Sequence, residues 1–358
     1  MERRWWITLL ITTCLFVSSI GRGFRMKHKV DSSVYNHTLT TILVEYASAV
    51  YISDSTDLFT WTCSRCDGQT KGFEVIELIV DVQNCLQNTD CRHLLGLQMI
   101  LMLLLLHSEA LKKPDNSIRN WIENLFWKQL DFDYPGCTDG KVHHGFFSAY
   151  NNTILRSGIL DGVSRAKEAY GNLKIMVTGH SMGGAMAAFC GLDLALIYGT
   201  KNVQVTTFGQ PRIGNAAFTS YYSKFVPNTF RVTHAHDIVP HLPPYYQRFP
   251  QKTYHHFPRE VWLYNIGFAF LIYPVEKICD GSGEDPECSR SVPGNSISDH
   301  LTYFGADMAC DKPSKCRIVM APNLASYGEV DNDGNFALHR APSKFIRRMK
   351  KEQKMSGQ

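Results

Sequence analysis

The fold of this chain is decided by one stretch, Lys174-Ile175-Met176-Val177-Thr178-Gly179-His180-Ser181-Met182-Gly183-Gly184-Ala185-Met186-Ala187-Ala188-Phe189. Its residues 175–178 predict a buried strand, and the small and apolar residues from Gly184 onward predict a helix. Between them stands Gly-x-Ser-x-Gly, the spacing of a sharp strand-to-helix turn that presents a serine at the carboxyl edge of a parallel sheet. Gly179 and Gly183 lack a Cβ, which lets strand and helix approach each other. The alternative, a glycine-rich turn without chemistry, leaves the strand and helix on either side unexplained.

The position of Ser181 predicts a nucleophile. Because a helix begins directly behind it, the backbone N–H of Met182 and the positive end of that helix point at an oxyanion formed by attack on a carbonyl. Further β-branched or aromatic runs at 203–208 and 229–233, with a helix between strands, predict a parallel sheet covered by helices.

A serine needs a base and an orienting acid, and in this type of sheet they follow it in the order acid, then histidine. The best acid is Asp237, which comes just after the 229–233 strand, whereas Asp193 falls inside the helix behind Ser181. We favour His300 as the base, because the polar Ser296-Ile297-Ser298-Asp299 leads into it and an apolar segment follows. The other downstream histidines are His241, His255, His256 and His339; His255 and His256 lie among aromatic residues, which favours packing or surface roles.

A competing set of metal-type ligands stands at His234, His236, Asp237 and His241. A zinc hydrolase would use such groups to activate water. The spacing is wrong for a known pattern of two histidines, an aspartate and a histidine, and a zinc site would leave the serine turn unexplained.

The N-terminus has the order of a secretory signal: Arg3 and Arg4, an uncharged apolar run over 5–20, then Gly21-Arg22-Gly23. We predict a signal peptide over 1–23; a retained membrane anchor is the alternative, disfavoured by the short apolar run. Secretion makes disulfides the default for the ten later cysteines. The pairs Cys279 with Cys288 and Cys310 with Cys316 each bracket a polar loop. The Cys63-Ser64-Arg65-Cys66 stretch predicts a structural bridge more than a redox or half-zinc motif.

Composition indicates a globular chain, with 44% hydrophobic residues and a mixed charge of net +4. No linker or repeat divides it, so we predict one large domain over 24–342, followed by a basic tail at 343–358. Most such tails are merely solvated; attraction to anionic lipid is the minority interpretation. We predict no nucleic-acid partner. Asn36 and Asn151 begin glycosylation sequons, which become relevant if the chain is secreted.

Four ordered motifs carry a resemblance to a known family: Gly179-His180-Ser181-Met182-Gly183-Gly184-Ala185, Thr207-Phe208-Gly209-Gln210-Pro211-Arg212-Ile213-Gly214-Asn215, residues 231–244, and Asp299-His300-Leu301-Thr302-Tyr303-Phe304-Gly305. Together they resemble a class 3 (fungal-type triacylglycerol) lipase, and a plant member more than a fungal one, from about Tyr35 to Cys310. The resemblance implies an α/β-hydrolase fold, a triad of Ser181, Asp237 and His300, and no metal or organic cofactor. It also supports the Cys63–Cys66 and Cys279–Cys288 bridges.

In such lipases a short helix covers the acyl groove as a lid, and residues 115–128 match it. Its apolar residues recur at helical spacing and face away from polar neighbours; they are Ile118, Trp121, Ile122, Leu125 and Phe126. Closed, this stripe covers the site, and open, it can lie on a lipid surface. An ordinary core-packed helix is the alternative that the stripe alone leaves open.

The chain departs from the family just before the lid. The family has Phe-Arg-Gly followed by Ser or Thr, half of the oxyanion hole, where this chain reads Leu103-Leu104-Leu105-Leu106-His107-Ser108-Glu109-Ala110-Leu111. Codons for this peptide, read from the last base of the Leu106 codon, can encode Ala-Phe-Arg-Gly-Thr. We hypothesise that residues 92–111 are translated in a shifted frame, through a splice variant, an indel or a wrong gene model. Sequencing the transcript tests this, and a shifted frame without such a peptide contradicts it.

As written, Leu111 takes the place of the second oxyanion donor; its N–H remains, but it has no hydroxyl. Loss of one such donor costs about a hundred- to a thousandfold in rate. The sequence therefore predicts a secreted lipase or carboxylesterase acting on acyl esters at a lipid–water interface, with contact to a membrane or lipid-droplet surface. A feruloyl esterase or phospholipase on the same triad is one alternative, since fold does not fix substrate. A catalytically impaired protein that binds lipid surfaces is the other.

Overall fold

The computed structural model describes residues 34–81, 89–96, 100–108, 128–245, 253–268, 271–311, 327–330 and 336–339. The described residues from Tyr35 onward belong to one compact unit. Several predicted features lie outside the described residues: the signal peptide, Leu111, the lid residues Ile118, Trp121, Ile122, Leu125 and Phe126, Cys316, and the basic tail. None of the described helices is both long and apolar enough to cross a membrane.

The described residues form six α-helices and fourteen strands. The helices are α2 (His37–Ala49), α3 (Ser55–Thr60), α5 (His144–Asn151), α6 (Ile154–Tyr170), α7 (Met182–Tyr198) and α8 (Ala216–Phe225). The first strands are β1 (Val75–Asp81), β2 (Thr89–Gly96), β3 (Ile100–Ser108), β4 (Gln129–Asp131), β5 (Lys141–His143), β6 (Ile175–His180) and β7 (Val203–Phe208). The later strands are β8 (Thr229–His234), β9 (Glu260–Phe268), β10 (Leu271–Ile278), β11 (Thr302–Tyr303), β12 (Ala306–Asp307), β13 (Gly328–Val330) and β14 (Phe336–His339).

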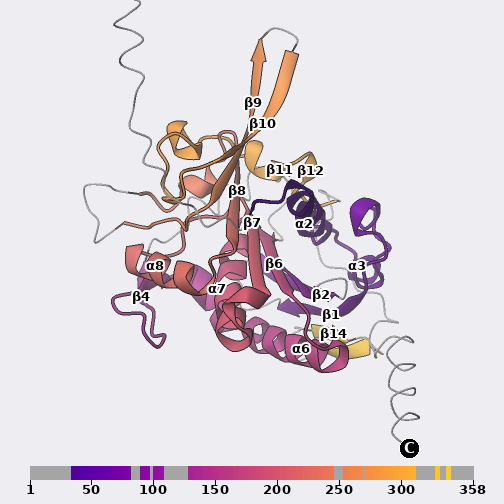
Figure 1. Ribbon diagram of the computed structural model, residues 1–358. Helices are drawn as coiled ribbons and strands as arrows, with labels where there is room; N and C mark the ends of the chain where they lie inside the picture. Colours follow the sequence, from indigo (N-terminus) through magenta and orange to yellow (C-terminus); the bar gives the residue numbers. More distant parts are fainter. Residues whose placement is uncertain are drawn as a thin grey trace, which may run out of the picture. The chain divides into compact units, whose positions relative to one another are not determined.

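One large sheet organises these elements (Figure 1), and its described strands lie in the order β10-β9-β8-β7-β6-β3-β2-β1-β14-β13. Its central strands β3, β6, β7, β8 and β9 run parallel, and the strands on either side are antiparallel. The carboxyl ends of the parallel strands therefore meet at one edge, where β6 delivers Ser181 and β8 leads to Asp237.

A separate hydrophobic core lies on each face of the sheet. Alternate residues of a strand point to opposite faces, and β1 shows this: Ile79 joins one core, while Leu78 and Val80 join the other. The first core contains residues of α5, α6, α7 and α8, and the second contains residues of α2 and α3. The predicted sheet covered by helices is therefore present, and its two faces are shielded from water by different parts of the chain.

The segment that departs from the family still supplies strands. Residues 89–96 and 100–108 form the antiparallel pair β2 and β3, and β3 pairs in parallel with β6 from Ile100 opposite Ile175 to Leu104 opposite Gly179. The departing segment thus lies within the large sheet, with β3 directly beside β6, the strand that leads to Ser181.

Helix α7 is apolar on all sides, so it can only be stable when surrounded by protein. It is buried from Met182 to Ala195. At its start, a Cβ added to Gly179 would lie 2.5 Å from the Gly183 carbonyl oxygen, closer than atoms can pack. This contact is the close strand-to-helix approach that the Gly-x-Ser-x-Gly spacing predicts.

The structure contains both disulfides that the resemblance supports, Cys63–Cys66 and Cys279–Cys288. Cys310 is also disulfide-bonded, and Cys316, its predicted partner, lies outside the described residues. Cys137 and Cys190 are not in disulfides, against the default for a secreted chain. Burial raises the pKa of the Cys190 thiol well above its usual value, so this cysteine stays protonated and unreactive.

Candidate active site

Ser181 occupies the sharp turn between β6 and α7. Its backbone has φ 58° and ψ −131°, a left-handed conformation that residues with a side chain rarely adopt. The strained turn is held in place because the Ser181 N–H donates to the Phe208 carbonyl of β7 over 2.9 Å. The serine is half-buried. Such strain in a non-glycine residue is typical of functional positions, where surrounding structure maintains it.

Asp237 and His300 form a buried hydrogen-bonded pair, and each residue is 1% exposed. Asp237 comes three residues after β8, and an isolated bridge to Ser296 brings the chain that leads to His300 alongside it. The His300 Nδ1 lies 2.9 Å from the Asp237 Oδ2. A carboxylate only accepts hydrogen bonds, so Nδ1 carries a proton, and in the neutral imidazole Nε2 then keeps its lone pair. This is the tautomer that a general base requires.

Tyr303 is a further contact of Asp237 that the sequence analysis did not identify. Its hydroxyl donates to the Asp237 Oδ2 over 2.5 Å, and its ring is fully buried. Burial, then the charge of Asp237, raises the pKa of the Tyr303 hydroxyl well above its usual value, so it remains a donor. The other oxygen, Oδ1, accepts from the Val239 N–H over 2.8 Å. Three donors therefore hold this carboxylate in one orientation.

His180 connects β6 to the backbone of His300, a second feature that the sequence analysis missed. The His180 Nε2 lies 2.8 Å from the His300 carbonyl oxygen and must donate to it, so Nδ1 accepts from the Tyr51 hydroxyl at 2.6 Å. Burial, then His300, lowers the pKa of His180 well below its usual value and keeps the imidazole neutral. The ring centroids of His180 and His300 are 4.4 Å apart. The residue beside Ser181 is thus tied directly to the predicted base.

Gly209 completes the packing around the pair. It follows β7 with φ +57°, and an added Cβ would lie 2.9 Å from both the Asp237 Oδ2 and the His300 Nδ1. Any side chain here would push the acid and the histidine apart. The motif 207–215 contained this glycine, but only the folded structure gives the reason for it.

One of the two predicted oxyanion donors can be placed. Met182 is the first residue of α7, where a backbone N–H has no acceptor within its own helix. Leu111, the other, lies outside the described residues.

The competing zinc cluster does not assemble. His234 Nδ1 pairs with the Asp299 carbonyl at 2.9 Å, His236 Nδ1 with the Pro293 carbonyl at 3.1 Å, and both nitrogens of His241 pair with backbone carbonyls. These imidazoles brace the loops around Asp237. His256 is packed as predicted: it is buried, and its Nε2 lies 2.7 Å from the Pro240 carbonyl oxygen.

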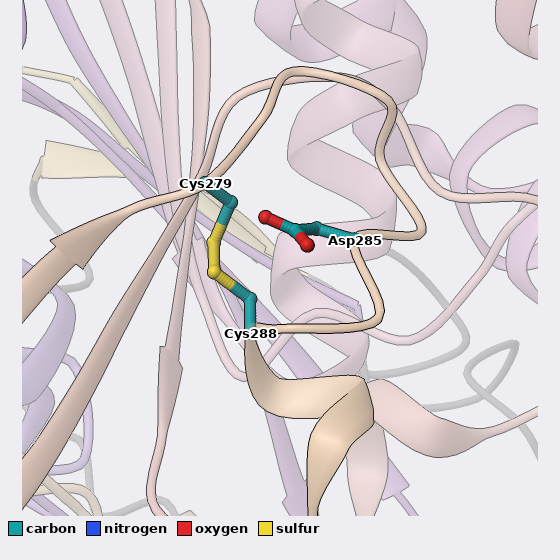
Figure 2. Close-up of side chains that lie close together, drawn as sticks. All are labelled: Cys279, Asp285 and Cys288. Carbon is teal, nitrogen blue, oxygen red and sulfur yellow. A yellow bond between two sulfur atoms is a disulfide. The ribbon is translucent and has the colours of Figure 1, made fainter. Parts of the chain in front are cut away.

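Cys279, Asp285 and Cys288 are the group of metal-type side chains that the described residues bring within coordination distance of one another. Figure 2 shows that the two sulfur atoms are bonded to each other, which removes them as thiolate ligands. Asp285 instead caps this loop, accepting from the backbone N–H groups of Asp280 and Glu287. The cluster is a loop closure.

The two glycosylation candidates differ in surroundings. Asn36 is exposed and is the N-cap of α2, where its Oδ1 accepts from the Leu39 N–H over 2.9 Å. Asn151 is half-buried at the end of α5, and its Oδ1 accepts from Arg156. Asn36 is therefore the more accessible acceptor.

A buried ion pair fixes the Cys279–Cys288 loop against the chain that follows β7. The Arg212 guanidinium contacts both carboxylate oxygens of Glu284, at 2.7 and 2.9 Å, and the two side chains are 5% and 9% exposed. Burial alone would raise the pKa of Glu284, but the Arg212 charge and hydrogen bonds outweigh it and lower this pKa overall.

This lowered pKa predicts acid sensitivity. The ionised pair stabilises the fold above about pH 4.3, the usual glutamate value, and its contribution is lost as pH falls through the lowered folded value. Glu284→Gln should reduce the free energy of unfolding by about 3–5 kcal/mol at pH 7, because it leaves the Arg212 charge buried and unpaired. Denaturant unfolding should show that the difference in the free energy of unfolding between the variant and the unmodified protein is smaller near pH 3 than at pH 7. Asp67→Asn, in the exposed pair with Lys71, is the control and should change little; a difference independent of pH would contradict the assignment.

Comparison with known proteins shows similarity to class 3 lipases. Residues 113–247 match the family model Lipase (class 3). The lipase of Rhizomucor miehei is 32% identical over 255 residues, which are 69% of this chain and 62% of that protein. The secreted mono- and diacylglycerol lipase 1 of Fusarium solani is 35% identical, over 61% of this chain and 64% of that protein. The chain thus spans less than two thirds of the length of these two relatives.

A solved structure extends the likeness to the fold. It is that of a triacylglycerol lipase in which a serine protease triad forms the catalytic centre. It is 30% identical, with a TM-score of 0.60, over 77% of this chain and 98% of that one. The closer likeness to plant members stays a prediction from the motifs. With its fungal relatives this chain shares both sequence and the α/β-hydrolase fold, and it belongs to the class 3 lipase family.

Proposed function

We propose that this protein is a serine carboxylic ester hydrolase of the triacylglycerol lipase type, with Ser181 as nucleophile, His300 as base and Asp237 as orienting acid. The observation that carries the proposal is a serine held at positive φ in the turn between β6 and α7, directly after His180, whose ring bonds the backbone of His300 in the buried Asp237–His300 pair. Strain at a serine and a pre-oriented imidazole are both costly unless they serve chemistry.

The reaction follows from the orientation of the His300 ring, whose Nδ1 faces Asp237. Its Nε2 takes the proton of the Ser181 hydroxyl as Oγ forms a bond to the ester carbonyl carbon. The resulting imidazolium donates through Nδ1 to Asp237, which lowers the cost of its charge, and Nε2 then gives the proton to the leaving alcohol as the carbon–oxygen bond breaks. Water, deprotonated by the same nitrogen, releases the acid from the acyl-enzyme, and the proton returns to Ser181.

The oxyanion is stabilised by the Met182 N–H at the positive end of α7. The second donor is the backbone N–H of Leu111 in this chain, without the hydroxyl that the family pattern supplies. We expect hydrolysis to be slower than in a lipase with the full pattern, by up to the hundred- to thousandfold value of one donor.

The substrate is an acyl ester presented at a lipid–water interface. The apolar stripe predicted over 115–128 suits an acyl chain better than a small polar ester. A feruloyl ester or a phospholipid uses the same chemistry, so the alcohol of the ester must be identified by assay.

We further propose that the protein is secreted. The disulfides Cys63–Cys66 and Cys279–Cys288 need an oxidising compartment. The predicted signal at 1–23 and the secreted lipase of Fusarium solani support the same location. Glycosylation is then expected at Asn36 and, less accessibly, at Asn151.

Hydrolysis of two esters by the purified full chain tests the function. A glyceride emulsion and a soluble p-nitrophenyl ester are compared for the protein and its Ser181→Ala variant. We expect both esters to be hydrolysed, the emulsion in preference, and only by the unmodified protein. Folded protein without activity on either ester would contradict the proposal. Activity that appears only after Ala-Phe-Arg-Gly-Thr is restored before the lid would assign the defect to the oxyanion hole and support the impaired alternative.

Tyr303 is expected to act as a positioning residue. Tyr303→Phe keeps the buried ring but removes one donor to the Asp237 carboxylate. A hydrogen bond to a charged group contributes about 1.5–3 kcal/mol, so kcat on the soluble ester should fall about tenfold or more, with KM little changed. Tyr222→Phe is a matched control, because it also removes a buried tyrosine hydroxyl. That hydroxyl forms a 2.9 Å hydrogen bond with Thr229 and has no contact with the triad residues. The control variant should lose stability without losing kcat; an equal loss of kcat in both variants would reduce the role of Tyr303 to general packing.

A further inference from the structure

An arm of two strands extends past the sheet edge that carries the candidate site. Strand β9 pairs in parallel with β8 only as far as Leu263, opposite His234, the last residue of β8. Residues 264–268 continue in the same direction. At about 3.3 Å per residue these five residues reach about 17 Å beyond the end of β8. β10 returns beside β9 as an antiparallel partner, and Figure 1 shows the pair projecting from the sheet.

The described side chains of this arm are mostly apolar or aromatic, Asn265 being the polar exception, and most are exposed to water. Ile266, Ile272 and Tyr273 are 53%, 68% and 58% exposed. Ile266 lies directly opposite Tyr273, and Tyr264 opposite Val275, so these four side chains share one face of the arm. The sequence contains no Asp, Glu, Lys or Arg between Glu260 and Glu276. The charge-free stretch thus includes all of the described part of β9 and β10 that projects beyond β8.

The root of the arm is held by polar contacts and a disulfide. Glu276 accepts from the Tyr35 hydroxyl at 2.9 Å and lies 2.5 Å from the His37 Nδ1 at the start of α2. Cys279, one residue after β10, is bonded to Cys288. The rings of Trp262 and Tyr264 stack with centroids 4.2 Å apart where the arm leaves the sheet. The arm therefore starts from a fixed base.

The exposed apolar side chains of this arm indicate that it contacts a partner. A two-stranded ribbon alone is at best marginally stable in water, and grouped exposed apolar side chains mark an interaction surface. The partner must be apolar, because the arm offers no charge, and it must lie beyond the carboxyl edge of the sheet, because the arm points there. Tyrosine rings are favoured where an apolar phase meets water. A surface of lipid meets all three conditions.

We propose that the arm, residues 264–268 and 271–275, inserts into the surface of a glyceride aggregate and holds the Ser181 edge of the sheet against it. This inference rests on the proposed function, whose substrate would form that surface. The arm is distinct from the predicted lid: it is a rooted extension of the sheet, and it acts by docking the protein, whereas the lid would act by uncovering the site. A second copy of the chain, paired along the edge strand β10, is the competing occupant.

Partitioning of the full chain onto lipid tests the proposal without any need for catalysis. In the Ser181→Ala background, Ile266→Ser with Tyr273→Ser is compared with a control that changes Leu196 and Ile197 to Ser. The control residues are 40% and 56% exposed at the far end of α7 from Ser181. Flotation with a triolein emulsion stabilised by phosphatidylcholine measures the bound fraction, and thermal unfolding confirms that each variant folds. If the double variant does not fold, the single variant Ile266→Ser is used in its place.

We expect the arm variant to partition at least about tenfold less, and the control within about twofold of its parent. With Ser181 present, the arm variant should lose emulsion hydrolysis to a similar extent and keep its kcat/KM on a soluble ester. Unchanged partitioning would overturn the proposal. So would a dimer, seen by sedimentation, that the arm variant breaks while its lipid binding stays the same. If the unmodified protein hydrolyses no ester, the proposed function fails, whereas the partitioning result still decides the role of the arm.

Discussion

Ser181→Ala is expected to lower ester hydrolysis about a millionfold, to the background rate, because removal of a triad nucleophile disables the other members as well. The variant should fold normally. Alanine keeps the Cβ that already stands at φ 58°, and the hydrogen bond from residue 181 to the Phe208 carbonyl uses only backbone atoms. Initial rates on the soluble ester, measured with active-site titration of the unmodified protein, give the ratio. Residual activity within about a hundredfold would place the nucleophile elsewhere.

Ser181→Gly separates the chemistry from the strain. Glycine adopts positive φ without steric cost, whereas other residues pay about 1–3 kcal/mol there. Since glycine also makes the unfolded chain more flexible, we expect a net gain of about 1 kcal/mol in the free energy of unfolding, together with the same loss of activity. An inactive protein of higher stability is the combination that a strained catalytic serine predicts.

Asp237→Asn has the second largest expected effect, a loss of about ten-thousandfold in kcat. Asp237 accepts from Val239 N–H on one oxygen and from His300 and Tyr303 on the other. In either orientation of an asparagine side chain, its NH₂ group would therefore face another hydrogen-bond donor. It also lacks the charge that stabilises the imidazolium of His300.

Asp193→Asn is the matched control for this variant. Asp193 is likewise a buried carboxylate, 4% exposed, and it accepts from Tyr134, Tyr150 and Arg156 inside the helical layer. Its replacement should lower stability and leave kcat within about threefold of the original, because it touches none of the three predicted catalytic residues. If both variants lose kcat to the same degree, the effect of Asp237→Asn comes from misfolding.

The sequence predicted much of the fold because local signals and sheet topology agree around Ser181. The apolar run at 203–208 coincides with β7, and the run at 229–233 with β8 less its last residue. Once these strands are parallel neighbours of β6, their carboxyl ends bring Asp237 to the serine edge. The choice of His300 depended on its polar approach and apolar continuation, and the structure places it against Asp237.

Contacts between distant segments could not be predicted. The Tyr51–His180 hydrogen bond joins residues 129 positions apart, and the role of Gly209 depends on two side chains from later loops. The β9–β10 arm was also missed, because a continuous apolar run has no periodicity that distinguishes a projecting ribbon from a buried strand. The lid and Leu111 stay predictions.

Mass spectrometry of the full chain after reaction with a fluorophosphonate tests the central claim most directly. The reagent bonds only to a serine whose proton is taken by a working base, so it reports the assembled Ser181–His300–Asp237 unit rather than the residues singly. The account predicts one phosphonate adduct per chain, on the peptide that contains Ser181, and a strongly reduced labelling rate in Asp237→Asn. An unlabelled folded protein that hydrolyses esters, or an adduct on another residue, would contradict it.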